Sequence, residues 1–292
     1  MAEAMIWTPG ATDATSELVP AGSPAPGTLV KRHRLSTRIW HWVSALTLLI
    51  MLMSGLMIFN AHPRLYWGQY GANFDHAWLE IGARDGGGFL RVGSLEVPTT
   101  GVLGVYTDGD GTVQNHAFPG WATIPTEYSL ADARLWHLAF ALVLAFSLLA
   151  YMVWSLANRH VQRDLSIRRE EWRLSHIWGD VKQHAKLNFP TGAAALRYNI
   201  LQKFSYIGVI FVLLPMMVLT GLTMSPNLNA GLSWLLDLFG GRQSARSLHF
   251  MAAWSLVAFF VIHIAMVVLA GPIREVRSMI TGRWRVEGEE PA

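Results

Sequence analysis

Cysteine is absent from this 292-residue sequence. Its absence excludes disulfide bonds, iron–sulfur clusters bound by this chain, and the Cys-x-x-Cys-His attachment of a c-type haem. Any redox group must therefore be held without a covalent bond, chiefly by histidine or methionine side chains.

Charged residues are also scarce, since they make up 15% of the chain while hydrophobic residues make up 52%. An ordinary soluble domain of this length carries more charge. The composition indicates that membrane lipid surrounds much of the chain, and nucleic acid is not expected as a partner. The formal net charge of +3 says less, because in a membrane protein the placement of Lys and Arg matters more than their sum.

Four long segments contain no Asp, Glu, Lys or Arg. Crossing ~30 Å of hydrocarbon takes about 20 apolar residues in a helix, and each segment reaches that length. The segments are residues 40–59, 135–156, 204–224 and 248–271. They predict an all-α membrane protein built as a four-transmembrane-helix bundle, and buried helices of a soluble protein are the alternative.

Basic residues gather in two of the flanking segments, which favours the cytoplasmic side for both. The residues before the first span are Lys31, Arg32, Arg34 and Arg38, with no acid among them. Residues 158–200 hold eight basic residues against four acids, Asp164, Glu170, Glu171 and Asp180. We expect a multi-pass protein of the bacterial inner membrane with both termini in the cytoplasm.

The segment between the first two spans, residues 61–130, has the opposite charge. Its acids are Asp75, Glu80, Asp85, Glu96, Asp108, Asp110 and Glu127, against Arg64, Arg84 and Arg91. We expect this long loop to face outwards, with short strands at residues 89–97 and 101–106 between glycine-rich turns. An insertion of this length usually serves a purpose, and docking a partner is one. A disordered or merely decorative loop is the other possibility.

The two ends of the chain complete the expected organisation. Residues 1–30 are rich in Ala, Pro, Gly and Thr, and they lack the basic start and apolar core of a cleavable signal peptide. We expect a disordered cytoplasmic tail there, a membrane domain over residues 31–285, and a short tail at 286–292.

Four of the eleven histidines lie within the apolar spans: His41, His137, His249 and His263. A histidine inside hydrocarbon is costly unless it is paired or coordinated, so each is a candidate functional residue. The other histidines lie in tails or loops, where a solvated imidazole needs no explanation.

Spacing along the last span indicates two sites. His249 and His263 are 14 residues apart, which at ~100° per residue is within about 40° of four whole turns, so both rings face the same way. They are also ~21 Å apart along the axis, so one metal ion cannot use both. This spacing suits two stacked haems near opposite faces of the membrane.

Topology selects the second ligand of each haem. His137 begins the second span on the outer side, level with His249 at the outer start of the fourth. His41 begins the first span on the inner side, and His263 lies in the inner half of the fourth. The pattern predicts two bis-histidine haems of b type. The alternatives are buried hydrogen-bonding histidines, or a proton or copper path in a non-haem transporter, although no carboxylate lies in the spans.

An arginine stands three residues before three of these histidines: Arg38 before His41, Arg134 before His137, and Arg246 before His249. Residues three apart share one helix face, so each guanidinium could reach the propionates of the haem that its histidine binds. An arginine that extends to the membrane surface at a helix end is the alternative.

These residues resemble a known family, the di-haem cytochrome b subunits of nickel–iron hydrogenases, formate dehydrogenases and thiosulfate reductases. The resemblance covers roughly residues 31–285 and rests on His41, His137 and the pair His249 and His263. A further match is the stretch from Arg197 to Lys203, which looks like the Tyr-Asn-Ala-Gly-Gln-Lys stretch of formate dehydrogenase gamma subunits.

The resemblance implies a quinone site near the inner haem, formed by Asn199 with Tyr198, Lys203 and the inner ligand His263. The sequence departs from the family in having Ile200 and Leu201 where Ala and Gly are frequent, which removes a close backbone approach. A polar turn beside the membrane is the other interpretation of this stretch.

The resemblance also implies a function: relay of electrons between the quinone pool, the inner haem, the outer haem and a periplasmic redox subunit docked on the outer loop. A molybdopterin oxidoreductase or a hydrogenase would be that partner, and quinone the only direct substrate. Imidazole on both axial positions leaves iron no open site, which disfavours oxygen chemistry. The alternative function is a stand-alone haem oxidoreductase that passes electrons between superoxide, or another small oxidant, and quinone.

Overall fold

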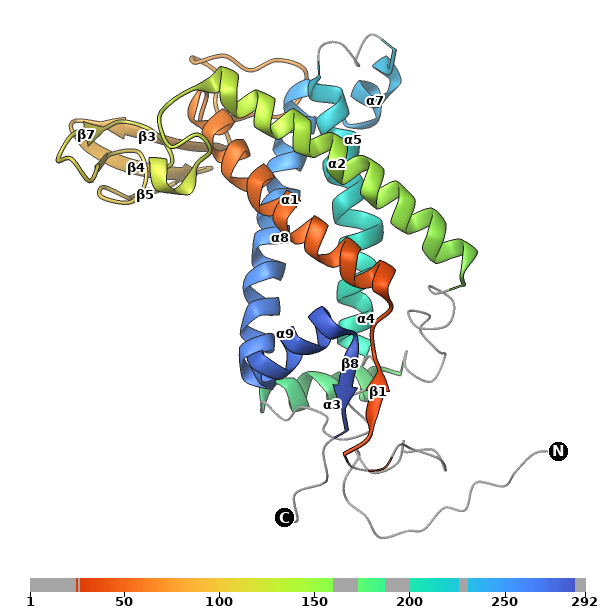
Figure 1. Ribbon diagram of the computed structural model, residues 1–292. Helices are drawn as coiled ribbons and strands as arrows, with labels where there is room; N and C mark the ends of the chain where they lie inside the picture. Colours follow the sequence, from red (N-terminus) through yellow and green to blue (C-terminus); the bar gives the residue numbers. More distant parts are fainter. Residues whose placement is uncertain (1–24, 26, 160–172, 187–199, 226–230, 287–292) are drawn as a thin grey trace. The chain divides into compact units, whose positions relative to one another are not determined.

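The computed structural model describes residue 25 and residues 27–159, 173–186, 200–225 and 231–286 (Figure 1). The chain divides into two compact units. The larger unit comprises residues 40–159 and 206–261, and the smaller comprises residues 1–39, 160–205 and 262–292.

Four helices in the described part of the chain are long and apolar enough to cross a membrane. They are α1 (Leu35–Asn60), α2 (Leu130–Ala157), the segment Ile200–Met224 and α8 (Arg242–Ala270). The predicted four-helix membrane fold is therefore confirmed. The helices begin before the predicted spans, because the polar turns that flank an apolar core can also be helical.

The third span is interrupted by a wider turn. It consists of α4 (Ile200–Ile207), a π-helical segment η5 (Gly208–Leu213) and α5 (Leu214–Met224). The Leu214 N–H donates to the Val209 carbonyl, five residues earlier. Pro215 follows and has no N–H to continue the ordinary helical ladder, which explains why the helix widens at this point.

The core of the bundle within the larger unit joins three of the spans. Its buried members are Met51 from α1, Leu144 and Leu148 from α2, Ile210 from η5 and Leu214 from α5. Many apolar residues on the membrane-spanning helices are exposed, for example Leu46 on α1, Phe146 on α2 and Phe260 on α8. Water would oppose such exposure, but lipid is as apolar as these side chains, so these faces are suited to a bilayer.

Residues 61–129, which we call the outer segment after their predicted side of the membrane, are folded, and Figure 1 shows their sheet beyond the end of α1 and the start of α2. An antiparallel sheet has the order β2 (Arg64–Leu65), β3 (Leu79–Arg84), β4 (Gly87–Val92), β5 (Leu95–Pro98). A smaller pair, β6 (Tyr106–Thr107) and β7 (Val113–Gln114), precedes the 3-10 turn η2 (Gly120–Ala122).

The predicted positions of the two strands in this segment are wrong in detail. Residues 89–97 form a hairpin instead of one strand, because Gly93, with φ of 59°, starts a two-residue turn that pairs Val92 with Leu95. Residues 101–106 form turns, with only Tyr106 in a strand.

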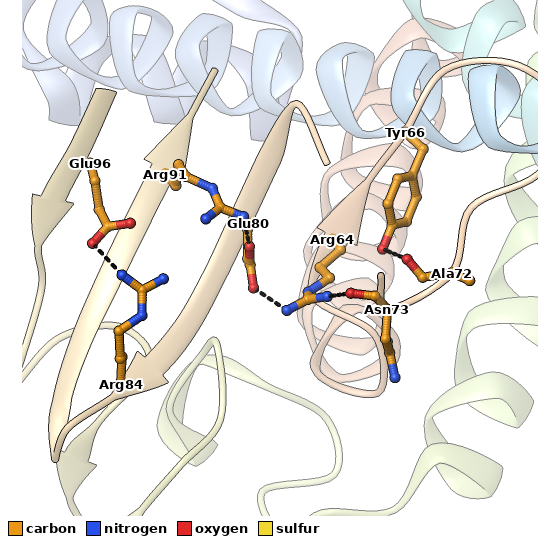
Figure 2. A network of polar contacts seen from close by, with 8 residues as sticks. All are labelled: Arg64, Tyr66, Ala72, Asn73, Glu80, Arg84, Arg91 and Glu96. Atoms are coloured by element: carbon orange, nitrogen blue, oxygen red, sulfur yellow. Dashed lines mark hydrogen bonds and ion pairs between the residues drawn. The ribbon is translucent and has the colours of Figure 1, made fainter. Parts of the chain in front are cut away.

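Glu80 is the centre of a charge network across this sheet (Figure 2). It lies opposite Arg64 on one neighbouring strand and Arg91 on the other, and both guanidinium groups pair with its carboxylate, Arg64 at 2.5 Å. Glu80 is only 5% exposed, so these two partners compensate a buried charge. Arg84 pairs with Glu96 at 3.2 Å on the surface of the same sheet.

The sheet packs on the end of α1 through a second apolar core, which contains Phe59, Leu65, Leu79, Ile81, Ala117 and Phe118. Asn60, the last residue of α1, fixes this junction. Its amide donates to the Phe118 carbonyl at 3.0 Å and accepts from the Phe118 N–H at 2.8 Å. The outer segment therefore forms a folded outer domain.

Helix α2 begins directly after this domain. The Ser129 hydroxyl accepts from the Asp132 N–H at 3.3 Å, and the Asp132 carboxylate lies in the first helical turn. Both features stabilise a helix N-terminus. The short helix α7 (Ser233–Leu238) precedes α8.

The smaller unit contains α3 (Leu174–Ala185), α9 (Pro272–Thr281) and an antiparallel pair of β1 (Leu29–Lys31) with β8 (Arg283–Arg285). Trp284 of β8 is 3% exposed and lies against two guanidinium groups, those of Arg32 at 4.2 Å and Arg274 at 5.0 Å. The expected tails lie largely outside the described residues. The first expected tail ends in ordered structure, since Leu29 and Val30 belong to β1.

Candidate functional site

His137 of α2 and His249 of α8 face each other in the larger unit. Their ring centroids are 6.3 Å apart and their planes are inclined by 60°. Each lies roughly two turns inside its helix, so neither imidazole is at a frayed end.

The Nδ1 atom of each ring is already engaged by a neighbouring helix. His137 Nδ1 lies 3.1 Å from the Met51 carbonyl oxygen and 3.1 Å from the Ser54 hydroxyl, both on α1. His249 Nδ1 lies 2.9 Å from the Thr220 hydroxyl on α5. These contacts leave Nε2 of each ring as the nitrogen that can bind a metal ion.

Glycines adjoin both imidazoles. A Cβ atom at Gly55 would lie 3.4 Å from Cε1 of His137, and one at Gly221 would lie 3.7 Å from Cε1 of His249. Larger side chains at these positions would occupy the space beside the rings. The two glycines therefore keep room for a flat group next to its ligands.

The pair fits a haem iron. A metal–imidazole bond is about 2.0–2.1 Å long, so two imidazoles on opposite sides of one iron have ring centres about 6 Å apart. The 6.3 Å between His137 and His249 agrees with that value. The arrangement is also chemically suitable, because the absence of cysteine leaves histidine as the natural axial ligand.

Arg246 lies one turn before His249 and is largely shielded from solvent. It donates to the His62 carbonyl at 2.5 Å, and its guanidinium lies 5.6 Å from the centre of the Phe59 ring. The ion pairs of the described residues do not include Arg246. A shielded guanidinium without a carboxylate suits an anionic ligand such as a haem propionate.

His62, just beyond the end of α1, adds to this basic corner. Burial lowers the pKa of His62, and the positive charges of Arg246 and Arg64 lower it further, against a smaller opposite effect of Glu80. Its ring stacks on Tyr66 with centroids 5.7 Å apart. No pattern in the sequence distinguishes His62 from the other loop histidines, so its place beside Arg246 appears only in the structure.

The other two candidate arginines have different surroundings. Arg134 is exposed on α2. Arg38 Nε donates to the Met279 carbonyl of α9 at 3.2 Å, within the smaller unit. Their contacts with propionates stay predictions.

The candidate inner ligands belong to different units, His41 to the larger and His263 to the smaller. His41 lies near the start of α1 and meets the Trp42 ring edge-on at 5.0 Å, and the neighbouring Trp40 stacks on Tyr151 at 4.0 Å. His263 lies on α8, the helix that also carries His249. Their pairing stays a prediction.

The predicted quinone residues fall mostly outside the described part of the chain, which omits Arg197, Tyr198 and Asn199. Lys203 is described, and it is buried on α4 at 8% exposure. The Ile200 N–H at the start of this helix donates to the Asp180 carboxylate at 3.4 Å. The quinone site therefore stays a prediction.

The outer domain is fastened to the start of α8, close to His249. The Gly68 carbonyl accepts from the N–H groups of Gln243 and Ser244 at 3.1 and 3.2 Å, and the Ser244 hydroxyl accepts from the Gly68 N–H at 2.7 Å. The Trp78 indole donates to the Ser247 hydroxyl at 2.9 Å. We refer to these contacts as the α8 clasp.

The hydroxyl residues and glycines beside the two histidines belong to a short repeat in the sequence. Residues 51–56 read Met-Leu-Met-Ser-Gly-Leu, and residues 217–222 read Met-Val-Leu-Thr-Gly-Leu. In both copies the hydroxyl residue contacts a histidine, and the glycine follows it. An internal comparison of the spans would have found this repeat.

An apolar helical bundle, with facing imidazoles at haem spacing and no cysteine for covalent attachment, defines a membrane-embedded b-type cytochrome. Comparison with known families agrees. The chain belongs to the prokaryotic cytochrome b561 family, whose model matches residues 32–282.

Three relatives illustrate the range of that similarity. A Ni/Fe-hydrogenase B-type cytochrome subunit of Azotobacter vinelandii is 25% identical over 56% of this chain and 74% of its own length. A protein-methionine-sulfoxide reductase subunit of Azospira oryzae is 26% identical over 84% of this chain and 93% of its own. A Ni/Fe-hydrogenase B-type cytochrome subunit of Cupriavidus necator is 21% identical over 83% of this chain and 82% of its own length. No solved structure matches significantly.

Proposed function

We propose that this chain is the di-haem membrane subunit of a redox complex, in which it relays electrons between the quinone pool and a periplasmic redox subunit. Bound haem b would supply the one-electron chemistry. The contribution of the protein is to hold each haem at a fixed depth, to exclude other iron ligands and to present a docking surface. The observation that carries the proposal is the facing pair of His137 and His249.

The imidazoles of His137 and His249 would both bind the iron of the outer haem in this proposal. Because the two Nδ1 atoms are engaged by helix groups, each ring has little freedom to swing away and open a site for oxygen. Such a site favours electron transfer over reaction of a small molecule at the iron. Arg246 and His62 would hold the propionates at the outer edge of the haem.

The second haem is proposed to be held by His41 and His263, near the inner face. The support is the 14-residue spacing on one continuous helix, α8, which carries both His249 and His263. The family resemblance supports a quinone site beside this haem, with Asn199, Tyr198 and Lys203 around the headgroup.

The outer domain is proposed as the docking surface for the redox partner. It is folded, and the α8 clasp joins it to the helix of an outer haem ligand, so a partner bound there would be close to that haem. A hydrogenase, a methionine-sulfoxide reductase or a molybdopterin oxidoreductase is the proposed class of partner, since relatives are named as subunits of the first two systems.

Charge on the outer domain disfavours the stand-alone alternative. A superoxide-consuming enzyme needs an open, basic approach to its haem. All three arginines of the segment are instead paired with carboxylates within the sheet, Arg64 and Arg91 with Glu80 and Arg84 with Glu96. The acids outside these pairs give the outer surface a negative charge that would repel a small anion.

The experiment is a reduced-minus-oxidised spectrum with haem quantification for wild type and single variants. We expect two b haems in wild type and one in His137→Ala and in His249→Ala. His116→Ala is the matched control, because His116 stacks on Tyr128 in the outer domain and is not a proposed ligand. If either ligand variant kept two haems with an unchanged spectrum, the pairing would be wrong.

A further inference from the structure

The repeated hydroxyl residues make the same set of contacts in both copies. The Ser54 hydroxyl lies 2.7 Å from the Ile50 carbonyl oxygen, and the Thr220 hydroxyl lies 2.6 Å from the Met216 carbonyl oxygen. Each therefore bonds to the carbonyl four residues earlier on its own helix. Each also contacts the Nδ1 atom of a histidine on the neighbouring helix. Both residues are fully buried.

Hydrogen counting assigns the direction of these contacts. A hydroxyl has one hydrogen to donate, and a carbonyl oxygen can only accept, so each hydroxyl hydrogen is used within its own helix. The hydroxyl oxygen must then accept from the imidazole. His137 Nδ1 also faces the Met51 carbonyl, which likewise requires a hydrogen on Nδ1. Both rings are thereby held with hydrogen on Nδ1 and a lone pair on Nε2.

We propose that Ser54 and Thr220 are positioning residues that fix the tautomer and the ring orientation of His137 and His249 for binding the outer haem. This inference rests on the proposed function and extends it to the residues behind the ligands. Groups that accept a hydrogen bond from a ligating imidazole increase its basicity, and replacing them typically weakens metal binding 10- to 100-fold.

Burial alone offers another account of these hydroxyls. Ser and Thr in helices often bond to the carbonyl one turn earlier without any further role. Thr223 supplies the comparison, because it is as buried as Thr220 on the same helix, and its hydroxyl bonds to the Thr220 carbonyl at 2.6 Å. The described contacts of Thr223 do not include an imidazole.

The test compares Thr220→Val with Thr223→Val, and adds Thr220→Ser as the rescue. Valine keeps the shape of threonine but cannot accept a hydrogen bond. We expect Thr220→Val to retain the outer haem about tenfold less tightly in a haem-transfer assay. Its low-spin electron paramagnetic resonance signal and its midpoint potential should shift as well. Thr220→Ser and Thr223→Val should resemble wild type.

The outcomes separate this inference from the proposed function. If His249→Ala loses one haem but Thr220→Val matches Thr223→Val in signal, potential and retention, the positioning role is wrong and the ligand assignment survives. If His249→Ala keeps both haems, the ligand assignment itself fails. Ser54→Ala provides a second test, with smaller shifts in the signal and the potential expected, because the Met51 carbonyl still accepts from the Nδ1–H of His137.

A separate observation concerns α9 in the smaller unit. Gly271, with φ of 103°, ends the apolar run of α8, and Pro272 begins α9 directly after it. One face of α9 presents Ile273, Val276 and Ile280, which are 84%, 40% and 54% exposed. The opposite face is occupied, since Arg274 lies against Trp284, and Glu275 pairs with Arg32 at 3.2 Å.

We infer that the exposed face of α9 lies in the membrane interface against lipid. The helix begins two residues after the last residue of a membrane-spanning helix, which sets its depth at the edge of the hydrocarbon. Apolar residues at positions i, i+3 and i+7 with arginine beside them are typical of a helix that lies along a membrane surface. The exposed Arg277 would meet anionic headgroups.

The absence of cysteine makes this inference directly testable. Single variants Ile273→Cys, Ile280→Cys and, as a control, Arg283→Cys would carry an environment-sensitive fluorophore in phosphatidylcholine vesicles. Brominated lipid should quench positions 273 and 280 much more than position 283. Equal quenching at all three would refute the inference. Energy transfer between labelled copies, with no lipid quenching, would assign the face to a second copy instead.

Discussion

Replacing Glu80 by Gln removes the negative charge that holds Arg64 and Arg91 together in the outer domain. Hydrogen bonds to charged groups contribute about 1.5–3 kcal/mol each, and breaking a buried ion pair costs about 3–5 kcal/mol. The two arginine side chains are 29% and 28% exposed, so water can recover part of that loss. We expect a net cost of about 2–3 kcal/mol for opening the sheet.

At about 1.4 kcal/mol per factor of ten, this cost corresponds to a roughly 30- to 140-fold larger open fraction. Amide hydrogen exchange in the detergent-solubilised protein measures it directly, as loss of protection in β3 and β4. Haem content should not change, because His137 and His249 lie on helices whose own contacts are untouched.

Glu96→Gln is the matched control for this prediction. Its ion pair with Arg84 is exposed, at 39% and 54%, and an exposed pair contributes about 0–1 kcal/mol. Equal loss of protection in the two variants would refute the reasoning, since it would mean that burial of Glu80 does not strengthen its pairing. A simultaneous loss of haem from Glu80→Gln would show that the outer domain and the haem site unfold together.

Four further predictions address the site and the orientation of the chain. Gly221→Leu fills the space beside His249, so haem quantification should show loss of one haem, whereas Gly208→Leu, on the same span with open space around it, should lose none. Because the folded state lowers the pKa of His62 below 6.5, the unfolded state binds the proton more readily, and hydrogen-exchange protection of the outer domain should fall as pH decreases below about 6.5. His62→Gln should flatten that dependence, and an unchanged profile would count against it. Asn199→Ala should weaken quinol binding about tenfold in stopped-flow haem reduction at matched haem content, as loss of one hydrogen bond implies. Protease should cut residues 61–130 only from the outer side of oriented vesicles, and cleavage from the cytoplasmic side would overturn the proposed topology.

The spans were predictable because hydrocarbon imposes a simple rule on sequence. A run of about twenty uncharged apolar residues is compatible with few structures other than a membrane-spanning helix. All four predicted spans correspond to helices. Helix ends were less predictable, since the start of α8 at Arg242 depends on the Gly68 carbonyl from a distant loop. Such a partner cannot be recognised from local sequence.

The strands of the outer domain could not be predicted from local sequence patterns for a related reason. Its charge predicted its side of the membrane, but its sheet depends on pairing between strands and on one turn at Gly93, which divides an apparently continuous strand. The buried position of Glu80 follows only from the register that places two arginines opposite it.

For the candidate site, histidine positions were informative because a polar ring inside an apolar span is rare. The pair His137 and His249 could be inferred from depth alone, and the structure brings these two rings together. The repeat around Ser54 and Thr220 marks these two hydroxyl residues in the sequence, but only three-dimensional contact reveals which histidine each one supports.

The wide turn at Gly208–Leu213 sets the rotational phase of the third span. A π-type turn takes in one more residue than an α-helical turn, so every residue beyond it is rotated by roughly 100° relative to an uninterrupted helix. Without that extra residue, Thr220 and Gly221 would point away from His249, although the sequence around them would be unchanged. The single widened turn therefore determines which side of α5 faces His249. Deleting one residue from this turn would rotate Thr220 away from the imidazole, although the span would remain apolar and long enough to cross the membrane.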